Sequence, residues 1–162
     1  MIVNKQVSSL LIGSSLLIAI LLVILPLPPW ALLYWPNFLV ITVLFWVLMQ
    51  PLSFGLGMAW CCGLLIDVLH GTPLGQHGLA MAVAAYLVLK LREILWFSVY
   101  WQQALFLLPV FGIHEFVLFW IDGVIGHDIE PLHRWLPVCT NTVIWPACAL
   151  CLERFAERDV RY

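Results

Sequence analysis

The distribution of charge constrains this chain more than any other feature of its sequence. Between Lys5 and Asp67 there is no Asp, Glu, Lys or Arg. So long an uncharged and mostly apolar run cannot be the interior of one small soluble core. Over the whole chain 64% of the residues are hydrophobic and 10% are charged, whereas a soluble domain is nearer half apolar and a quarter charged. The sequence therefore predicts an integral membrane protein.

The apolar stretches predict how often the chain crosses the bilayer. About 20 apolar residues cross as a helix, so six spans use most of the 162 residues and leave only short connections. We predict an all-α membrane protein with about six transmembrane helices, in a single polytopic domain over residues 1–162. The first span is expected to be an uncleaved segment, and the short third and fourth spans are expected to form a helical hairpin. The predicted spans are Leu10–Leu25, Asn37–Met49, Phe54–Leu69, Leu74–Leu89, Phe97–Ile121 and Trp135–Leu152.

Lysine and arginine positions predict the orientation. The run Lys90–Glu93 is the predicted basic loop between the fourth and fifth spans, and Asp122–Arg134 is the predicted acidic loop after the fifth. Basic residues favour the cytoplasmic side, so both chain ends are predicted inside and the acidic loop outside. With six spans, six of the seven basic residues share the inner side: Lys5, Lys90, Arg92, Arg154, Arg158 and Arg161.

The third predicted span carries a stripe of small residues. Gly55, Ala59 and Gly63 recur every four residues, and Asp67 is the next position on the stripe. Small residues let helices approach closely in a membrane, where association depends on packing and polar contacts. The stripe is therefore a candidate packing face within the protein, or a docking face for a helix of another protein.

Asp67 stands near the C-terminal end of its predicted helix, where the helix dipole disfavours a negative charge. A compensating group is expected, and the sequence offers the Thr72 hydroxyl, a loop amide, His70, or Arg134. An acidic residue near the membrane is a functional candidate, and a role in fixing the turn after this helix is the alternative.

Glu115 is the second carboxylate within a predicted span. Asp122 lies two turns further along the same helical face, whereas His114 is expected to point elsewhere. We expect an interhelical hydrogen-bonding role for Glu115. A proton relay or ion pathway is the alternative, although no Lys or Arg lies inside any predicted span.

The remaining motifs do not predict catalysis or a cofactor. Cys148 and Cys151 form a C-x-x-C, but they lie in an apolar segment without a second pair. No nucleophile elbow, zinc-protease motif or phosphate-binding loop is present, so no enzyme activity is predicted. With net charge −2 and no basic patch, nucleic acid is not an expected partner. The outer loop contains polar residues without a metal-ligand spacing, and they are interpreted as a polar surface: His127, Asp128, Glu130 and His133.

Four stretches, in order, resemble the MreD family of bacterial rod shape-determining membrane proteins. From the first to the last they are YWPNFLVITVLFWVL, GMAWCCGLLIDVLHGTPLGQHGLAMAVAAYLVLK, YWQQALF, and NTVIWPA followed by a basic tail. The resemblance extends over most of the chain from Trp35 to Arg161. The family's D-x-x-x-G-x-x-x-G pattern falls on Asp67, Gly71 and Gly75. The family's Trp-Pro motif falls on Trp145 and Pro146. The sequence PLSFG after the second span departs from the family, because it lacks the basic residues often found there.

The resemblance implies a non-enzymatic component of the lateral wall-elongation machinery in the inner membrane of Gram-negative rods. Family members associate with MreC, a single-span protein with a periplasmic domain. They act alongside the MreB filament, RodZ, and the RodA glycosyltransferase with its transpeptidase partner. The resemblance also implies a fold similar to the substrate-binding subunits of energy-coupling-factor transporters. The competing hypothesis is a small-molecule-binding subunit of a transporter, which requires a polar cavity.

Overall fold

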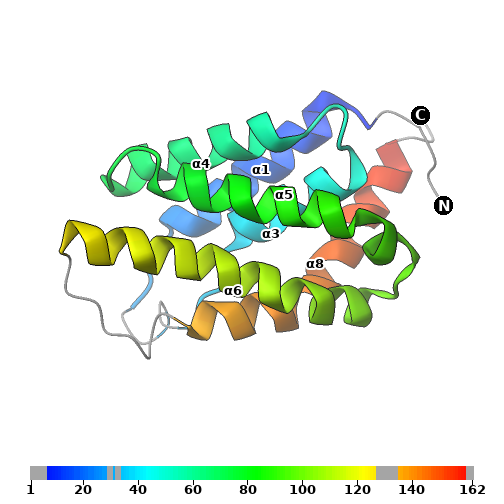
Figure 1. Ribbon diagram of the computed structural model, residues 1–162. Helices are drawn as coiled ribbons and strands as arrows, with labels where there is room; N and C mark the ends of the chain where they lie inside the picture. Colours follow the sequence, from blue (N-terminus) through cyan, green and yellow to red (C-terminus); the bar gives the residue numbers. More distant parts are fainter. Residues whose placement is uncertain (1–6, 29–30, 32–33, 127–134, 160–162) are drawn as a thin grey trace.

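The computed structural model describes residues 7–28, 31, 34–126 and 135–159, and these residues form six helices and no strand. The all-helical prediction is confirmed. Successive helices run in opposite directions along the bundle (Figure 1). The helices are α1 (Ser9–Ile24), α3 (Phe38–Met49), α4 (Leu56–His70), α5 (Gln76–Phe97), α6 (Tyr100–Ile125) and α8 (Leu136–Asp159).

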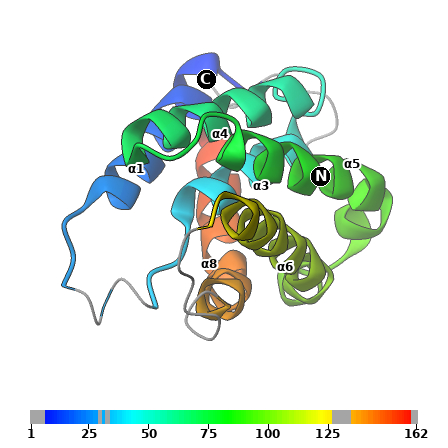
Figure 2. The same cartoon turned by 60° about the vertical axis from the view of Figure 1, so that its left-hand side comes forward.

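Helix α3 forms the centre of the bundle. Every residue from Leu39 to Leu48 is buried, because the helix is apolar on all of its faces and other helices surround it. It packs against α1, α4, α5 and α8, and Figure 2 shows it between these helices. The Asn37 side chain caps the start of α3 by accepting a hydrogen bond from the Val40 amide. The predicted boundary at Asn37 is therefore one residue from the observed start.

A few polar contacts fix how the outer helices surround α3. The Trp46 indole Nε1 of α3 donates to Ser15 Oγ of α1 over 2.8 Å. At the two ends of the chain, Ser8 donates from its amide and its hydroxyl to the Asp159 carboxylate, over 2.7 and 2.9 Å. The beginning of α1 and the end of α8 therefore lie at the same end of the bundle.

The fourth segment differs from the prediction. The predicted span is Leu74–Leu89, whereas α5 covers Gln76–Phe97 and contains Lys90–Glu93, so the loop predicted there is wrong. Lys, Leu, Arg and Glu are strong helix formers, and no Gly or Pro interrupts them. A group of charges indicates where a helix reaches the membrane surface, but it does not end the helix. The helix instead ends at Phe97, because the next residue, Ser98, has extended backbone geometry.

The last two helices also continue beyond their predicted ends. Helix α6 begins at Tyr100 and ends at Ile125, so Asp122 lies inside it and not in a loop. Helix α8 continues past Leu152 to Asp159. Good helix formers such as Glu153, Arg154 and Ala156 extend α8 beyond its apolar run. In α6 the chain stays helical through Asp122 until Gly126, whose φ of 84° ends the helix.

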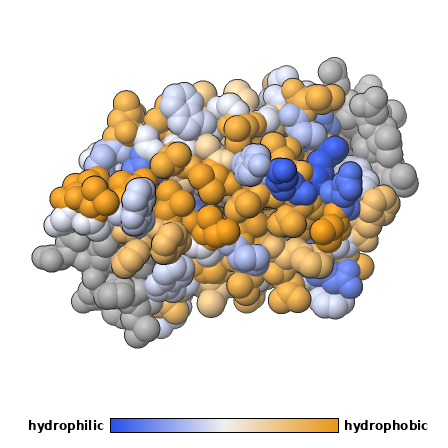
Figure 3. Space-filling view, in the orientation of Figure 1, coloured by the Kyte–Doolittle hydropathy of each residue, from blue (hydrophilic) through white to orange (hydrophobic). Residues whose placement is uncertain are grey.

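Two of the described helices, α6 and α8, are long and apolar enough to cross a membrane; α1, α3 and α4 are apolar but shorter. Apolar side chains cover the middle of the face shown in Figure 3, and the largest group of hydrophilic side chains lies toward its right-hand end. Large apolar side chains are exposed on the outer faces of all the described helices except α3.

Candidate functional site

The turn between α4 and α5 depends on two glycines. Gly71 follows α4 with φ of 66°, and Gly75 precedes α5 with φ of 100°. Both values lie in the left-handed region, which residues with a Cβ rarely adopt. The chain can therefore reverse within a few residues, and the first turn of α5 is held against the last turn of α4. This explains why Gly71 and Gly75, two of the predicted site residues, stand at these positions.

The Asp67 carboxylate is the centre of this turn. Its Oδ1 accepts hydrogen bonds from Thr72 Oγ1 over 3.0 Å and from the His77 amide over 2.9 Å, and its Oδ2 accepts from the Gly75 amide over 2.8 Å. His77 Nδ1 lies 2.8 Å from Oδ1. The Gly75 cap position has no side chain of its own, so Asp67 serves α5 as a capping residue supplied by the preceding helix.

Asp67 is 1% exposed, yet its charge has a favourable position. It stands at the C-terminal end of α4, where the helix dipole disfavours an anion, and also beside the N-terminal end of α5, where the dipole favours one. The Thr72 hydroxyl and loop amides, two of the partners offered by the sequence, both bind it. The ring partner is His77 and not His70. The His70 ring instead packs edge-on against His77, with 5.9 Å between ring centroids. Arg134 lies outside the described residues.

His77 is not among the partners of Asp67 predicted from the sequence. Its position just after the turn could have indicated this contact, because a tight hairpin brings the first turn of α5 next to the last turn of α4. Thr72 Oγ1 lies 3.4 Å from His77 Nδ1, the same nitrogen that faces Asp67. A catalytic Ser-His-Asp arrangement requires the hydroxyl on the opposite ring nitrogen. This cluster therefore organises a turn and lacks the geometry of a nucleophile.

The stripe of small residues lies where α4 meets α5. Ala59 and Gly63 are buried, and Gly55 precedes α4 as its cap residue. A Cβ placed on Gly63 would lie 2.5 Å from the His77 carbonyl oxygen and 2.6 Å from the Gly78 Cα. Backbone atoms occupy this space, so no side-chain rotation can make room. The sequence predicts that the stripe either packs within the protein or docks a helix of another protein. The contacts of Gly63 correspond to packing within the protein.

A second polar cluster lies on α6. The Glu115 carboxyl and His114 Nδ1 are 3.2 Å apart, so the expectation that His114 points away from Glu115 is wrong. Adjacent helical residues can meet in this way when both side chains bend toward the same neighbouring helix. Asp122, further along α6, accepts a 2.6 Å hydrogen bond from Gln76 Nε2 of α5. Asp122 therefore contributes to the contact between α5 and α6, whereas the contact between Glu115 and His114 lies within α6.

Glu115 and His77 line one cleft of about 310 Å³. Trp35, Asn37 and Leu118 form much of the remaining wall. His77 stands in the first turn of α5, directly after the α4–α5 turn. The Asp67 cluster and the Glu115 cluster are therefore neighbours around one partly polar space, although the sequence places them on different helices.

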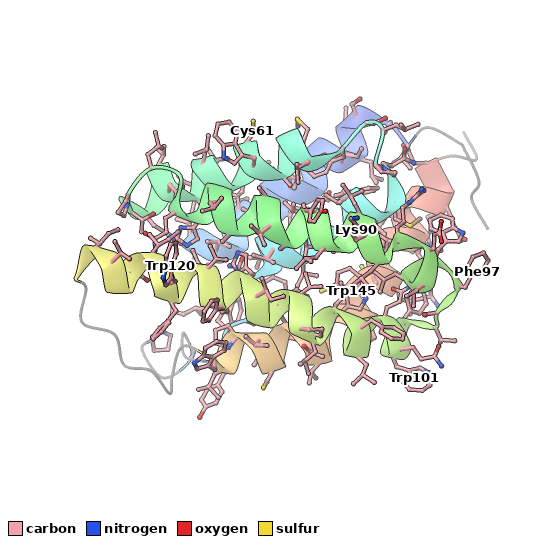
Figure 4. All side chains as sticks on the ribbon, in the orientation of Figure 1. Cys61, Lys90, Phe97, Trp101, Trp120 and Trp145 are labelled. Atoms are coloured by element: carbon pink, nitrogen blue, oxygen red, sulfur yellow. The ribbon has the colours of Figure 1, made fainter. Side chains whose placement is uncertain are left out.

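Trp145 and Pro146 lie in the middle of α8. The Trp145 ring is fully buried, and its Nε1 donates to Gln103 Oε1 of α6 over 3.2 Å. Gln103 Nε2 in turn donates to the carbonyl oxygens of Leu95 and Ser98. Trp145, labelled in Figure 4, thus links α8 to the connection between α5 and α6.

The described part of the chain contains no group of three His, Cys, Asp or Glu side chains that could hold a metal ion. The polar residues of the outer loop lie outside it.

Comparisons with known proteins agree with the family resemblance of the sequence. Residues 4–155 match the family model described as rod shape-determining protein MreD. The chain is also similar to the rod shape-determining protein MreD of Haemophilus influenzae, with 25% identity over 138 residues, which cover 83% of this chain and 85% of the relative. No solved structure matches it significantly. Because the family match extends over nearly the whole chain, including every helix core and the Asp67 turn, the chain belongs to the MreD family of rod shape-determining proteins.

Proposed function

We propose that this chain is a non-enzymatic, multi-pass component of the bacterial inner membrane, where it binds an MreC-like single-span partner. In this role it maintains rod shape and supports lateral peptidoglycan synthesis, directly or indirectly together with MreB, RodZ, RodA and the transpeptidase of RodA. The observation that carries the proposal is the family match over residues 4–155. The features below support the membrane arrangement that the proposal requires.

The exposed apolar surface supports embedding in a lipid bilayer. Leu17 on α1, Trp120 on α6 and Val143 on α8 are 59%, 61% and 77% exposed, and many similar side chains surround the bundle. Soluble monomers rarely expose apolar patches of this extent. The α3 helix, with 12 residues, rises only about 18 Å, but the other helices enclose it, so a bilayer would contact them instead. Six crossings, one by each described helix, and a fold similar to energy-coupling-factor substrate-binding subunits are parts of this proposal.

The charges of the described residues support an orientation with both chain ends in the cytoplasm. Lys90 and Arg92 lie in the last part of α5, and the Ser8–Asp159 contact brings the chain ends to one end of the bundle. Arg92 Nε donates to the Leu48 carbonyl oxygen over 3.3 Å. The loop after α3 therefore lies at the same end as Arg92, although its PLSFG sequence has no basic residue.

The orientation can be tested with reporter fusions. A reporter fused after Tyr162, or fused to the chain at Arg92, should be active only as a cytoplasmic reporter, because basic residues are retained on that side. A reporter placed near Asp128 should be active only as a periplasmic one. A periplasmic signal from the Tyr162 fusion would contradict the six-span arrangement.

Co-purification tests the proposed binding. The chain and a tagged MreC-like protein from the same organism, produced together and extracted in mild detergent, should elute as one complex. Depleting the chain in cells should convert rods to rounded cells, and the wild-type chain should restore rod shape. An unrelated single-span protein with the same tag serves as the control. Absence of a complex, together with unchanged cell shape after depletion, would contradict the proposal.

The small-molecule-binding alternative has one specific observation in its favour, the cleft between Glu115 and His77. Its volume of about 310 Å³ is at the lower limit of typical ligand pockets. A transport role requires solute uptake to fall when the chain is depleted, whereas the proposed role requires cell width to change with no change in uptake. Measuring both quantities in the same depletion strain separates the two functions.

A further inference from the structure

The connection between α5 and α6 exposes large apolar side chains at one end of the bundle. We call residues 96–102 the α5–α6 elbow. Ser98 and Val99 have extended backbone geometry, which turns the chain from one helix into the next. Phe97 is 85% exposed and Trp101 is 62% exposed. Figure 4 shows both at the outer edge of that end of the bundle, with Lys90 nearer the middle.

The elbow extends past the charged residues of α5. Phe97 follows Lys90 by seven residues, which corresponds to about 10 Å along the helix axis. Lys90 and Arg92 are expected to mark the cytoplasmic membrane surface. Arg92 is held by the Leu48 carbonyl and by the Trp96 ring, whose centroid lies 5.5 Å away. On this placement the exposed aromatic side chains of the elbow lie at the level of the lipid headgroups, within reach of a polypeptide segment that leaves the membrane there.

Two grooves meet at the elbow and share Phe97 and Ser98. One, of about 730 Å³, lies between α5 and α6 and is lined by Glu93, Trp101 and Leu105 among others. The other, of about 460 Å³, reaches the ends of α3 and α8 and includes Glu153. Each groove is mainly apolar and has one carboxylate, and neither is lined by a Lys or Arg. A complementary occupant thus carries apolar anchors together with a basic group.

We propose that the α5–α6 elbow is the cytoplasmic docking surface for the basic juxtamembrane segment of the single-span partner. The inference rests on the proposed function, because it locates the binding of that same partner. A single-span protein whose main domain is periplasmic retains Lys and Arg just inside the membrane. That segment emerges from the bilayer at the depth of the elbow, where Glu93 and Glu153 can receive its positive charges while its apolar side chains enter the grooves.

Site-specific photocrosslinking tests the location. A photoreactive phenylalanine analogue at Phe97 or Trp101 should form a crosslink to the co-produced MreC-like protein, and mass spectrometry should place it within the basic segment before the partner's span. The analogue at Val143, which is exposed on α8 but lines neither groove, is the matched control. Crosslinks from Val143 alone, or crosslinks mapped only to the periplasmic domain, overturn the proposed surface.

Charge reversal tests the complementarity. Glu93→Lys should reduce the co-purified partner about tenfold, and changing a partner Lys in the crosslinked segment to Glu should restore it. Glu93→Gln removes the charge without reversing it, so it should reduce partner recovery by less than Glu93→Lys does. Equal recovery with wild type and Glu93→Lys overturns the inference and leaves the proposed function standing. Absence of a wild-type complex contradicts the function itself.

A phospholipid with an ethanolamine headgroup presents a similar combination of apolar chains and a positive charge. Native mass spectrometry of the purified chain with added phosphatidylethanolamine or phosphatidylglycerol distinguishes this occupant. The protein-docking proposal is overturned in favour of a lipid if three results occur together. Wild type retains phosphatidylethanolamine selectively, Glu93→Lys loses this retention, and no crosslink to the partner forms. Crosslinks to the partner with no lipid selectivity support it.

Discussion

Replacing Gly63 with leucine should prevent α4 and α5 from packing and remove most of the folded protein. The new Cβ alone would lie 2.5 Å from the His77 carbonyl oxygen and 2.7 Å from the Gly78 nitrogen. Overpacking against side chains typically costs about 1–3 kcal/mol, and a contact with backbone cannot be relieved by a rotamer change. We expect a destabilisation of about 3 kcal/mol or more. The yield of monodisperse protein in detergent and its midpoint of thermal unfolding measure the effect.

Gly57 provides a matched control on the same helix. A Cβ at Gly57 would meet no atom within 4 Å. Glycine is about 1 kcal/mol less favourable than alanine inside a helix, so Gly57→Ala should be neutral or slightly stabilising. Gly63→Ala should still destabilise, because its single added carbon already overlaps the backbone of α5. Equal unfolding midpoints for the two alanine variants would show that Gly63 does not determine the approach of these helices.

Replacing Asp67 with leucine should be nearly as damaging, for a different reason. The change leaves the Thr72 hydroxyl and the Gly75 and His77 amides without their acceptor. Each unpaired buried donor costs about 1–3 kcal/mol, so the α4–α5 turn should lose at least about 3 kcal/mol. In cells we expect loss of rod shape and weaker recovery of the MreC-like partner, with no change in solute uptake.

Asp67→Asn distinguishes this structural role from a role of the charge itself. The amide oxygen can still accept from Thr72 and His77, whereas the amide nitrogen would face the Gly75 donor. The asparagine variant should therefore be partly tolerated and should keep more shape and partner binding than the leucine variant at matched expression. Complete and equal failure of both variants, at unchanged thermal stability, would contradict the structural role and favour proton or cation coupling at Asp67.

Local patterns were enough to predict much of this protein. The long uncharged run predicts apolar helices, and α1 and α3 begin and end within one residue of the predicted segments. The predicted hairpin of α4 and α5 and the Thr72 and amide partners of Asp67 also depend on residues close together in the chain. Such features can be predicted because turn glycines, prolines and hydrogen bonds across a short turn act within about ten residues.

Other features depend on contacts between distant residues. His77 could be placed beside Asp67 only once the hairpin had closed, and Gln103 could be recognised as the partner of Trp145 only in the packed bundle. A group of charges predicts a loop at Lys90, whereas Lys90 continues the helix α5.

The tertiary structure alone decided which apolar face is inside. Gly57 and Gly63 occupy the same helix, yet the first faces open space and the second contacts the backbone of α5. Similarly, α1 and α3 are both apolar throughout, but α3 is enclosed and α1 is at the edge. In a soluble protein the polar face of a helix shows its orientation. In a membrane protein the lipid-facing and core-facing sides are equally apolar, so the sequence determines that a helix forms, and the packing of its neighbours determines how that helix is rotated.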